Sequence, residues 1–142
     1  MKVLKKKLPS IRRRKKVLWE LCKQITRKRY VNQDGTWNCY TCDKKIDVPK
    51  NAHTGHCVPQ AFGGLYLRYD LRNLRIQDFR CNINYGGNGG VYVMRLRKEI
   101  GDDNVVDMFT LLDRKNEKKT SMVERMFIED KIEEYRKILH SL

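Results

Sequence analysis

The stretch NAHTGHCVPQ, residues 51–60, holds two of the three histidines of a 142-residue chain, in the spacing His53-x-x-His56. Residues 52–64 are typical of a strand that leads into a glycine-bearing loop. Because successive strand residues alternate sides, His53 projects from the same side as residue 55. A H-x-x-H pair by itself is more typical of a structural zinc site than of catalysis.

Apolar side chains recur at helical spacing on both sides of this stretch. They predict a helix over residues 12–29, in which Cys22 is a core residue and not a metal ligand. Residues 65–77, LYLRYDLRNLRIQ, alternate in part and predict the second strand of a hairpin. Helical character resumes over residues 91–101 and ends at Gly101, a typical C-terminal cap.

The last part of the chain predicts a helix from Ser121, which forms a capping box with Glu124, to about residue 140. Its apolar stripe is wide for so short a helix, so it packs either on the domain or on a second copy of the chain. The residues of this stripe are Met122, Val123, Met126, Phe127, Ile128, Ile132, Tyr135, Ile138 and Leu139.

The composition is that of a highly charged globular protein with an affinity for polyanions. Lys and Arg number 31 against 17 Asp and Glu, a formal net charge of +14, which favours nucleic acid as the partner. Nothing approaches the roughly 18 apolar residues of a membrane helix, and the basic start lacks the apolar stretch of a secretory signal. We therefore expect a cytoplasmic protein, without membrane contact and without a disulfide framework for its five cysteines.

The cysteine spacing predicts a zinc site. Cys39 and Cys42 form a C-x-x-C pair, and Cys81 follows well downstream. The position three residues before Cys81 is Asp78, whose carboxylate is an acceptable fourth ligand for a tetrahedral Zn²⁺. Cys57 is the rival fourth ligand. The alternative is that the cysteines are reduced and bind no metal.

The two histidines lie between the halves of this zinc site, and Asn73 and Asn82 follow them. A histidine on a strand, an asparagine in the connecting loop and a metal-binding His or Asn on the next helix define the ββα-metal, or HNH, nuclease motif. The usual strand signature is Asp-His followed closely by Pro, and this chain has Gly55 in place of the Asp. His53, on the same side of the strand, can replace the missing carboxylate as a metal ligand.

The chain further resembles the lambdoid-phage NinG (Rap) family of recombination proteins, which share an HNH-type core. The matching pieces run in order over residues 15–112: KVLWELCKQITRKRY, CYTC, HTGHCVPQ, LRYDLRN, Gln77, CN at 81–82, GN at 87–88, Tyr92, Leu96 and IG at 100–101. The chain departs from the family at Asp78, where a cysteine is expected, and at Gln60, where a basic residue is common.

The resemblance implies a small α+β fold: a ββα-metal core with a zinc knuckle, flanked by N- and C-terminal helices. It divides the chain into a basic N-terminal arm (1–14), a nuclease domain (15–112) and a C-terminal helix (113–142) that is a candidate dimerisation element. A phage-encoded member would act in the cytoplasm of the host cell.

The resemblance also assigns roles to the residues of the motif. His56 is the general base that activates water, and Asn73 fixes the loop so that this imidazole points at the water. A single Mg²⁺ or Mn²⁺ is held by His53 and Asn82, with Asn84 and Asn88 as fallback ligands. Cys39, Cys42, Asp78 and Cys81 hold the structural Zn²⁺.

The implied function is a metal-dependent endonuclease, a homodimer that cuts branched recombination intermediates such as Holliday junctions or D-loops. The alternatives are an HNH nicking enzyme for duplex DNA and a noncatalytic, zinc-containing DNA-binding module. In each case arginines around the motif would contact backbone phosphates. These arginines are Arg68, Arg72, Arg75, Arg80, Arg95 and Arg97.

Overall fold

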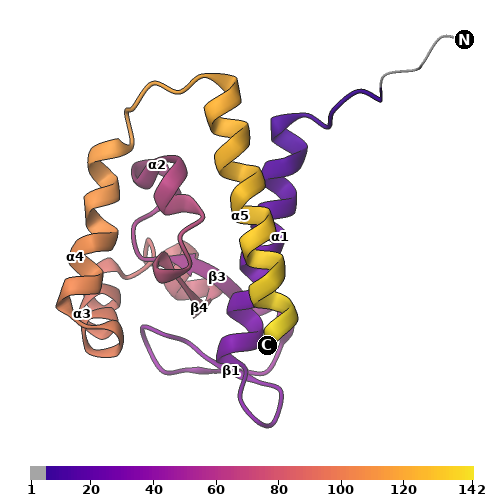
Figure 1. Cartoon of the computed structure of the whole chain (residues 1–142). Coiled ribbons are helices and arrows are strands. Elements are labelled where there is room, and N and C mark those ends of the chain that lie inside the picture. The colour runs from indigo at the N-terminus through magenta and orange to yellow at the C-terminus, as the bar shows by residue number, and fades with distance from the viewer. Residues whose placement is uncertain (1–5) are drawn as a thin grey trace, which may run out of the picture.

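The computed structural model describes residues 6–142 and has an α+β fold in which helices surround two small antiparallel sheets (Figure 1). The first five residues of the predicted basic arm lie outside the described part. The principal helices are α1 (Ile11–Tyr30), α2 (Gln60–Arg68), α3 (Gly89–Ile100), α4 (Asp102–Thr110) and α5 (Ser121–Ser141). The strands are β1 (Trp37–Asn38), β2 (Lys45–Ile46), β3 (Ala52–His56) and β4 (Leu74–Asp78).

Helices α1 and α5 lie side by side along one side of the molecule (Figure 1). The apolar stripe of α1 is buried as the heptad-like spacing predicts, and Cys22 is fully buried in it. Ile128, Ile132 and Tyr135 of α5 pack against this stripe, and Arg14 donates to Glu129 at 2.6 Å beside it. From Phe127 onward the apolar stripe of α5 therefore packs on the domain itself, the first of its two expected partners. The stripe residues Met122, Val123 and Met126, at the start of the helix, are exposed.

Strands β3 and β4 form the central hairpin, which lies between the α1–α5 pair and the α3–α4 pair (Figure 1). The register pairs His53 with Gln77, Gly55 with Arg75 and His56 with Leu74. In chain order β3 is followed by α2 and then by β4, and the π-helical turn Arg80–Asn84 comes directly after β4. The hairpin expected from the sequence is confirmed, although its second strand begins only at Leu74.

The glycine-bearing loop expected after β3 is instead helix α2, which is kinked at Gly64. Gly64 adopts a φ of +73°, a left-handed conformation that glycine enters at low cost, and this non-helical residue divides α2 into two short helical segments that meet at the kink. Residues 65–68, expected to belong to the second strand, complete this helix. Leu67 of α2 is fully buried in a second core together with residues of α3 and α4.

The helix ends agree with the sequence except at α5. Gly101, at a φ of +87°, ends α3, and α4 begins directly after it. The N-cap of α5 is Thr120, whose hydroxyl accepts from the backbone N–H of Val123, and not Ser121 as the capping box predicted. Within the described residues, none of the helices has the length and apolar character that crossing a membrane requires.

Candidate active site and metal centre

A hollow of about 420 Å³ brings His53, His56 and Asn82 together. The histidines come from β3, and Asn82 comes from the π-helical turn Arg80–Asn84. Helix α1 forms the opposite wall with Trp19, Lys23 and Arg27. With Gln60, which also lines it, the hollow combines two imidazoles, two amides and two cationic side chains, a set of groups suited to binding and hydrolysing a phosphodiester.

His56 is held by a hydrogen bond and by a stacking contact. Its Nε2 lies 3.0 Å from the backbone carbonyl of Arg68, and its ring stacks on Trp19 with centroids 5.2 Å apart. A carbonyl only accepts, so the neutral ring carries its proton on Nε2 and keeps a lone pair on Nδ1. The arrangement leaves Nδ1 able to take up a proton.

The pKa of His56 is lowered to about 4, mainly because burial disfavours the charged imidazolium. The hydrogen bond to the Arg68 carbonyl raises the pKa by less than this, and the positive charge of Arg68 lowers it further. The imidazole is therefore neutral at pH 7, which a general base requires. In the unfolded chain the same group titrates near pH 6.5.

This pKa difference predicts how the stability of the fold depends on pH. The unfolded chain binds the proton more readily, so the stabilising contribution is complete above pH 6.5 and is lost as the pH falls toward 4. We expect the free energy of unfolding to fall by about 2 kcal/mol between pH 7.5 and pH 5 through this group. Urea unfolding at both pH values should show the loss in the wild type and in the exposed-site control His140→Ala. His56→Gln should lack this loss, and an equal fall in its free energy of unfolding between the two pH values would contradict the assignment to His56.

His53 and Asn82 are in direct contact. The Asn82 amide nitrogen lies 3.1 Å from His53 Nδ1 and donates to it, so this imidazole nitrogen has no proton and its lone pair faces the amide. Turning the Asn82 amide over would place its oxygen at the same distance. Two ligand atoms that bind one ion at right angles, with bonds of about 2.1 Å, lie about 3 Å apart. The separation of His53 Nδ1 and the Asn82 amide therefore fits one shared cation. An imidazole nitrogen with an amide oxygen suits an ion of intermediate hardness such as Mn²⁺.

Gly55 on β3 packs directly against the side chain of Gln77 on β4. A Cβ at Gly55 would lie 2.0 Å from Gln77 Oε1, so no side chain fits there while Gln77 keeps its position. Gln77 is fully buried and donates to Thr41 Oγ1 at 3.1 Å and to the Gly87 carbonyl at 2.8 Å, which holds it in place. Glycine is therefore the residue that fits at position 55 while Gln77 keeps these hydrogen bonds.

Gly55→Ala should consequently destabilise the protein by about 1–3 kcal/mol, because the added methyl group overpacks a filled site. The backbone at position 55 is not in the left-handed region, so the effect is steric alone. Chemical unfolding of both single variants and of Gly55→Ala/Gln77→Ala gives the coupling between the two positions. We expect the Gly55→Ala cost to shrink by at least about 1 kcal/mol in the Gln77→Ala background; equal costs would refute the clash.

Asn73 lies beneath the site and is fully buried. Its side-chain oxygen accepts from the Val58 backbone N–H at 2.7 Å, and its nitrogen donates to the carbonyls of Val58 and Leu67 at 3.1 Å. One amide thus ties the chain after β3 to the end of α2, close to the Arg68 carbonyl that holds His56. This is the loop-fixing position predicted for Asn73.

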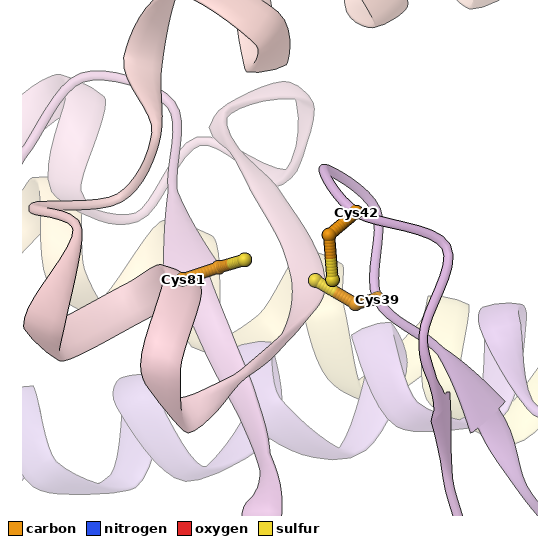
Figure 2. A group of neighbouring side chains, drawn as sticks. All are labelled: Cys39, Cys42 and Cys81. Carbon is orange, nitrogen blue, oxygen red and sulfur yellow. The ribbon is translucent and has the colours of Figure 1, made fainter.

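The sulfur atoms of Cys39, Cys42 and Cys81 lie within 4.8 Å of one another and could hold a metal ion such as zinc (Figure 2). The first two come from the turn between β1 and β2, and Cys81 faces them from the π-helical turn. Burial raises the pKa of the Cys39 thiol, but hydrogen bonds from the Asp78 backbone N–H, the Thr41 hydroxyl and nearby N–H groups together lower it below its ordinary value. Such bonds favour the thiolate that a metal needs.

Neither residue considered as the fourth ligand joins this group. The Asp78 carboxylate accepts from the backbone N–H of Arg80 at 3.0 Å and lies 3.7 Å from Lys44 Nζ, so the prediction that it faces the metal is not supported. Cys57 is buried in the second core, among residues of α2, α3 and α4. Within residues 6–142 the metal group consists of three cysteines, and all five cysteines are free of disulfides.

Four of the six arginines expected to bind DNA are paired with carboxylates. Arg72 pairs with Asp70 and Asp107, Arg95 with Asp43, and Arg97 with Asp102. The Arg75 side chain is 4% exposed and bonds Glu99 between two tyrosine rings, so it cannot reach a phosphate and its assignment was wrong. Arg68 and Arg80 are the two without such a partner in the described part of the chain.

Sequence reasoning missed the wall of the hollow that α1 supplies. The predicted outer face of this helix included Lys23 and Arg27, but nothing in the spacing showed that this face looks toward the histidines. The sequence held one indication of this wall. Trp19 precedes Lys23 and Arg27 by four and eight residues, so an aromatic ring and two cations share one face of the helix.

The comparisons with known proteins add no relative. Neither a family model, a curated protein nor a solved structure matches this chain.

Proposed function

We propose that this protein is a metal-dependent endonuclease of the ββα-metal type that hydrolyses phosphodiester bonds in DNA. The observation that carries the proposal is the hollow in which His53 and Asn82, 3.1 Å apart, lie beside the neutral imidazole of His56. The order of hairpin and short helix, the loop-fixing Asn73 and the net charge of +14 support it.

His56 has the central chemical role in this proposal. Its Nδ1 takes the proton of the attacking water, and the Arg68 carbonyl accepts from Nε2–H and stabilises the imidazolium that forms. A bound phosphate raises the low pKa of His56 through its negative charge, which brings the base closer to the working pH. Trp19, stacked on the ring, restricts its orientation.

The remaining groups hold the substrate. Lys23 and Arg27 place positive charge on the α1 wall, where they bind phosphate oxygens. A divalent ion on His53 and Asn82 would polarise the scissile phosphate and stabilise the leaving oxygen. A zinc ion on the three cysteines would fix the π-helical turn that carries Asn82 to the turn between β1 and β2.

Branched recombination intermediates are the proposed substrates, as the resemblance to the NinG family suggests. The test is cleavage of an end-labelled four-way junction and a matched linear duplex, each with Mg²⁺, with Mn²⁺ and without added divalent ion. Omitting the ion is preferable to EDTA, because a chelator would also strip the cysteine site. Metal-dependent cuts near the branch are expected.

The other outcomes separate the competing functions. Equal cutting of the duplex would replace the junction specificity with a general HNH nicking activity. Intact DNA under every condition, with tight binding, would overturn the nuclease proposal and leave a zinc-containing DNA-binding module. Sedimentation with and without junction DNA tests the proposed homodimer, and a monomer in both would count against it.

A further inference from the structure

One face of α1 carries a row of cations that continues from the candidate active site along the helix. Arg12, Lys16, Lys23 and Arg27, with Trp19 among them, are spaced by four, three, four and four residues, so they share one face. From the first to the last they span about 22 Å of helix at 1.5 Å per residue. We call this row the α1 basic face.

Two hollows meet on this face. Trp19 forms part of the wall of the hollow that contains His56, and it also lines a neighbouring hollow of about 510 Å³ with Arg12, Lys16 and Arg68. A chain lying in both hollows would pass directly over the ring that stacks on His56. The two depressions thus give a path along α1 that ends at the candidate active site.

The charges on this path are largely free of carboxylate partners. In the described part of the chain, Arg12, Lys16 and Arg68 have no ion pair. Arg27 donates to the carbonyls of Ala52 and Pro49, which do not neutralise its charge. Lys23 is the one cation of the row that pairs with a carboxylate in the described part of the chain, that of Glu20, and the nearby Glu124 pairs with Lys15.

We infer that the α1 basic face, together with Arg68, binds the phosphate backbone of one DNA strand and leads it to His56. This rests on the proposed function for the class of its ligand, but the binding does not depend on cleavage. It assigns strand binding to α1 and replaces the four arginines that are paired with carboxylates. A row of cations without base-reading groups binds with little sequence preference and strong salt dependence.

The test is binding of a fluorescein-labelled four-way junction and of a labelled single strand by Arg12→Ala/Lys16→Ala, measured by anisotropy over a salt series. The His56→Ala background without added divalent ion keeps the DNA intact. Each lost phosphate contact should make the slope of the log association constant against log salt concentration less steep by about 0.9. It should also weaken binding by about five- to tenfold at 0.1 M salt. Both residues are exposed, so the double variant should fold as its parent does, which circular dichroism checks.

The matched control is Lys28→Ala/Arg29→Ala, which removes two exposed charges from the same helix outside both hollows. Its affinity should stay within about twofold of the parent. Unchanged affinity and slope in Arg12→Ala/Lys16→Ala, or an equal loss in the control, would overturn the inference. The two proposals fail separately. If Arg12→Ala/Lys16→Ala loses binding as predicted but the wild type never cuts DNA, only the nuclease proposal is overturned. If the wild type cuts DNA but Arg12→Ala/Lys16→Ala binds it normally, only the α1 path is overturned.

Discussion

His56→Ala is expected to lower the rate of DNA cleavage by about 10²–10⁴-fold while leaving DNA affinity within about threefold. General-base catalysis is typically worth this range, and His56 is the neutral imidazole at the centre of the hollow. Single-turnover cleavage with saturating Mn²⁺ measures the chemical step, and anisotropy without added divalent ion measures binding. Trp19, which stacks on the ring, should stay in place because it also packs against the core between α1 and α5.

Two further histidine variants show that the effect belongs to the site. His140→Ala changes the one histidine outside the hollow, which is exposed near the end of α5, and should cleave at the wild-type rate. His53→Ala should lose activity in a way that higher Mn²⁺ concentration partly restores, because it removes a ligand and not the base. Cleavage by His56→Ala at a rate within tenfold of the wild type would remove His56 from the mechanism.

Cys81→Ser should abolish metal binding at the cysteine cluster and destabilise the domain around it. Cys81 is the only one of the three ligands that comes from the π-helical turn, so its loss disconnects this turn from the turn between β1 and β2 (Figure 2). Zinc content per chain should fall from near one to near zero, and the Co²⁺-substituted protein should lose its thiolate charge-transfer band. The melting temperature should drop because metal binding to such a cluster is coupled to folding.

Cys57→Ala is the matched control, since Cys57 was the rival ligand but is buried in a different core. It should lower stability moderately, through the lost packing, and leave the zinc content unchanged. Asp78→Asn should also retain zinc, since the Asp78 carboxylate accepts from the backbone N–H of Arg80. Full zinc content in Cys81→Ser would contradict the three-cysteine site.

The local signals in the sequence predicted much of the fold. The apolar spacing of α1, the strand at His53 and His56, the cap at Gly101 and the C-x-x-C turn all follow from periodicity and turn chemistry that neighbouring residues determine. The glycines of α2 indicated a loop, whereas packing of Leu67 into a core with α3 and α4 stabilises a kinked helix there. Tertiary contacts of this kind have no local signature.

The candidate site was predictable in its residue types and less so in its contacts. His53, His56, Asn73 and Asn82 were identified from spacing and family resemblance. The structure places both histidines and Asn82 on the wall of one hollow, and Asn73 is buried with its amide bonded to the Val58 backbone. The Asp78 ligand and the Arg75 phosphate contact were not supported, because a carboxylate and a guanidinium each found a closer partner within the fold. Charge alone could not distinguish an arginine that binds DNA from one that binds Glu99.

The central claim is that His53 and Asn82 hold a divalent ion beside His56, and a crystal soaked with Mn²⁺ tests it most directly. The prediction is an anomalous difference peak within about 2.2 Å of His53 Nδ1 and Asn82 Oδ1, with the Asn82 amide turned so that its oxygen faces the ion. The same peak should vanish in His53→Ala, while the metal at the three cysteines stays. A saturated crystal in which the Asn82 nitrogen still donates to His53, with Mn²⁺ bound elsewhere, would contradict the account.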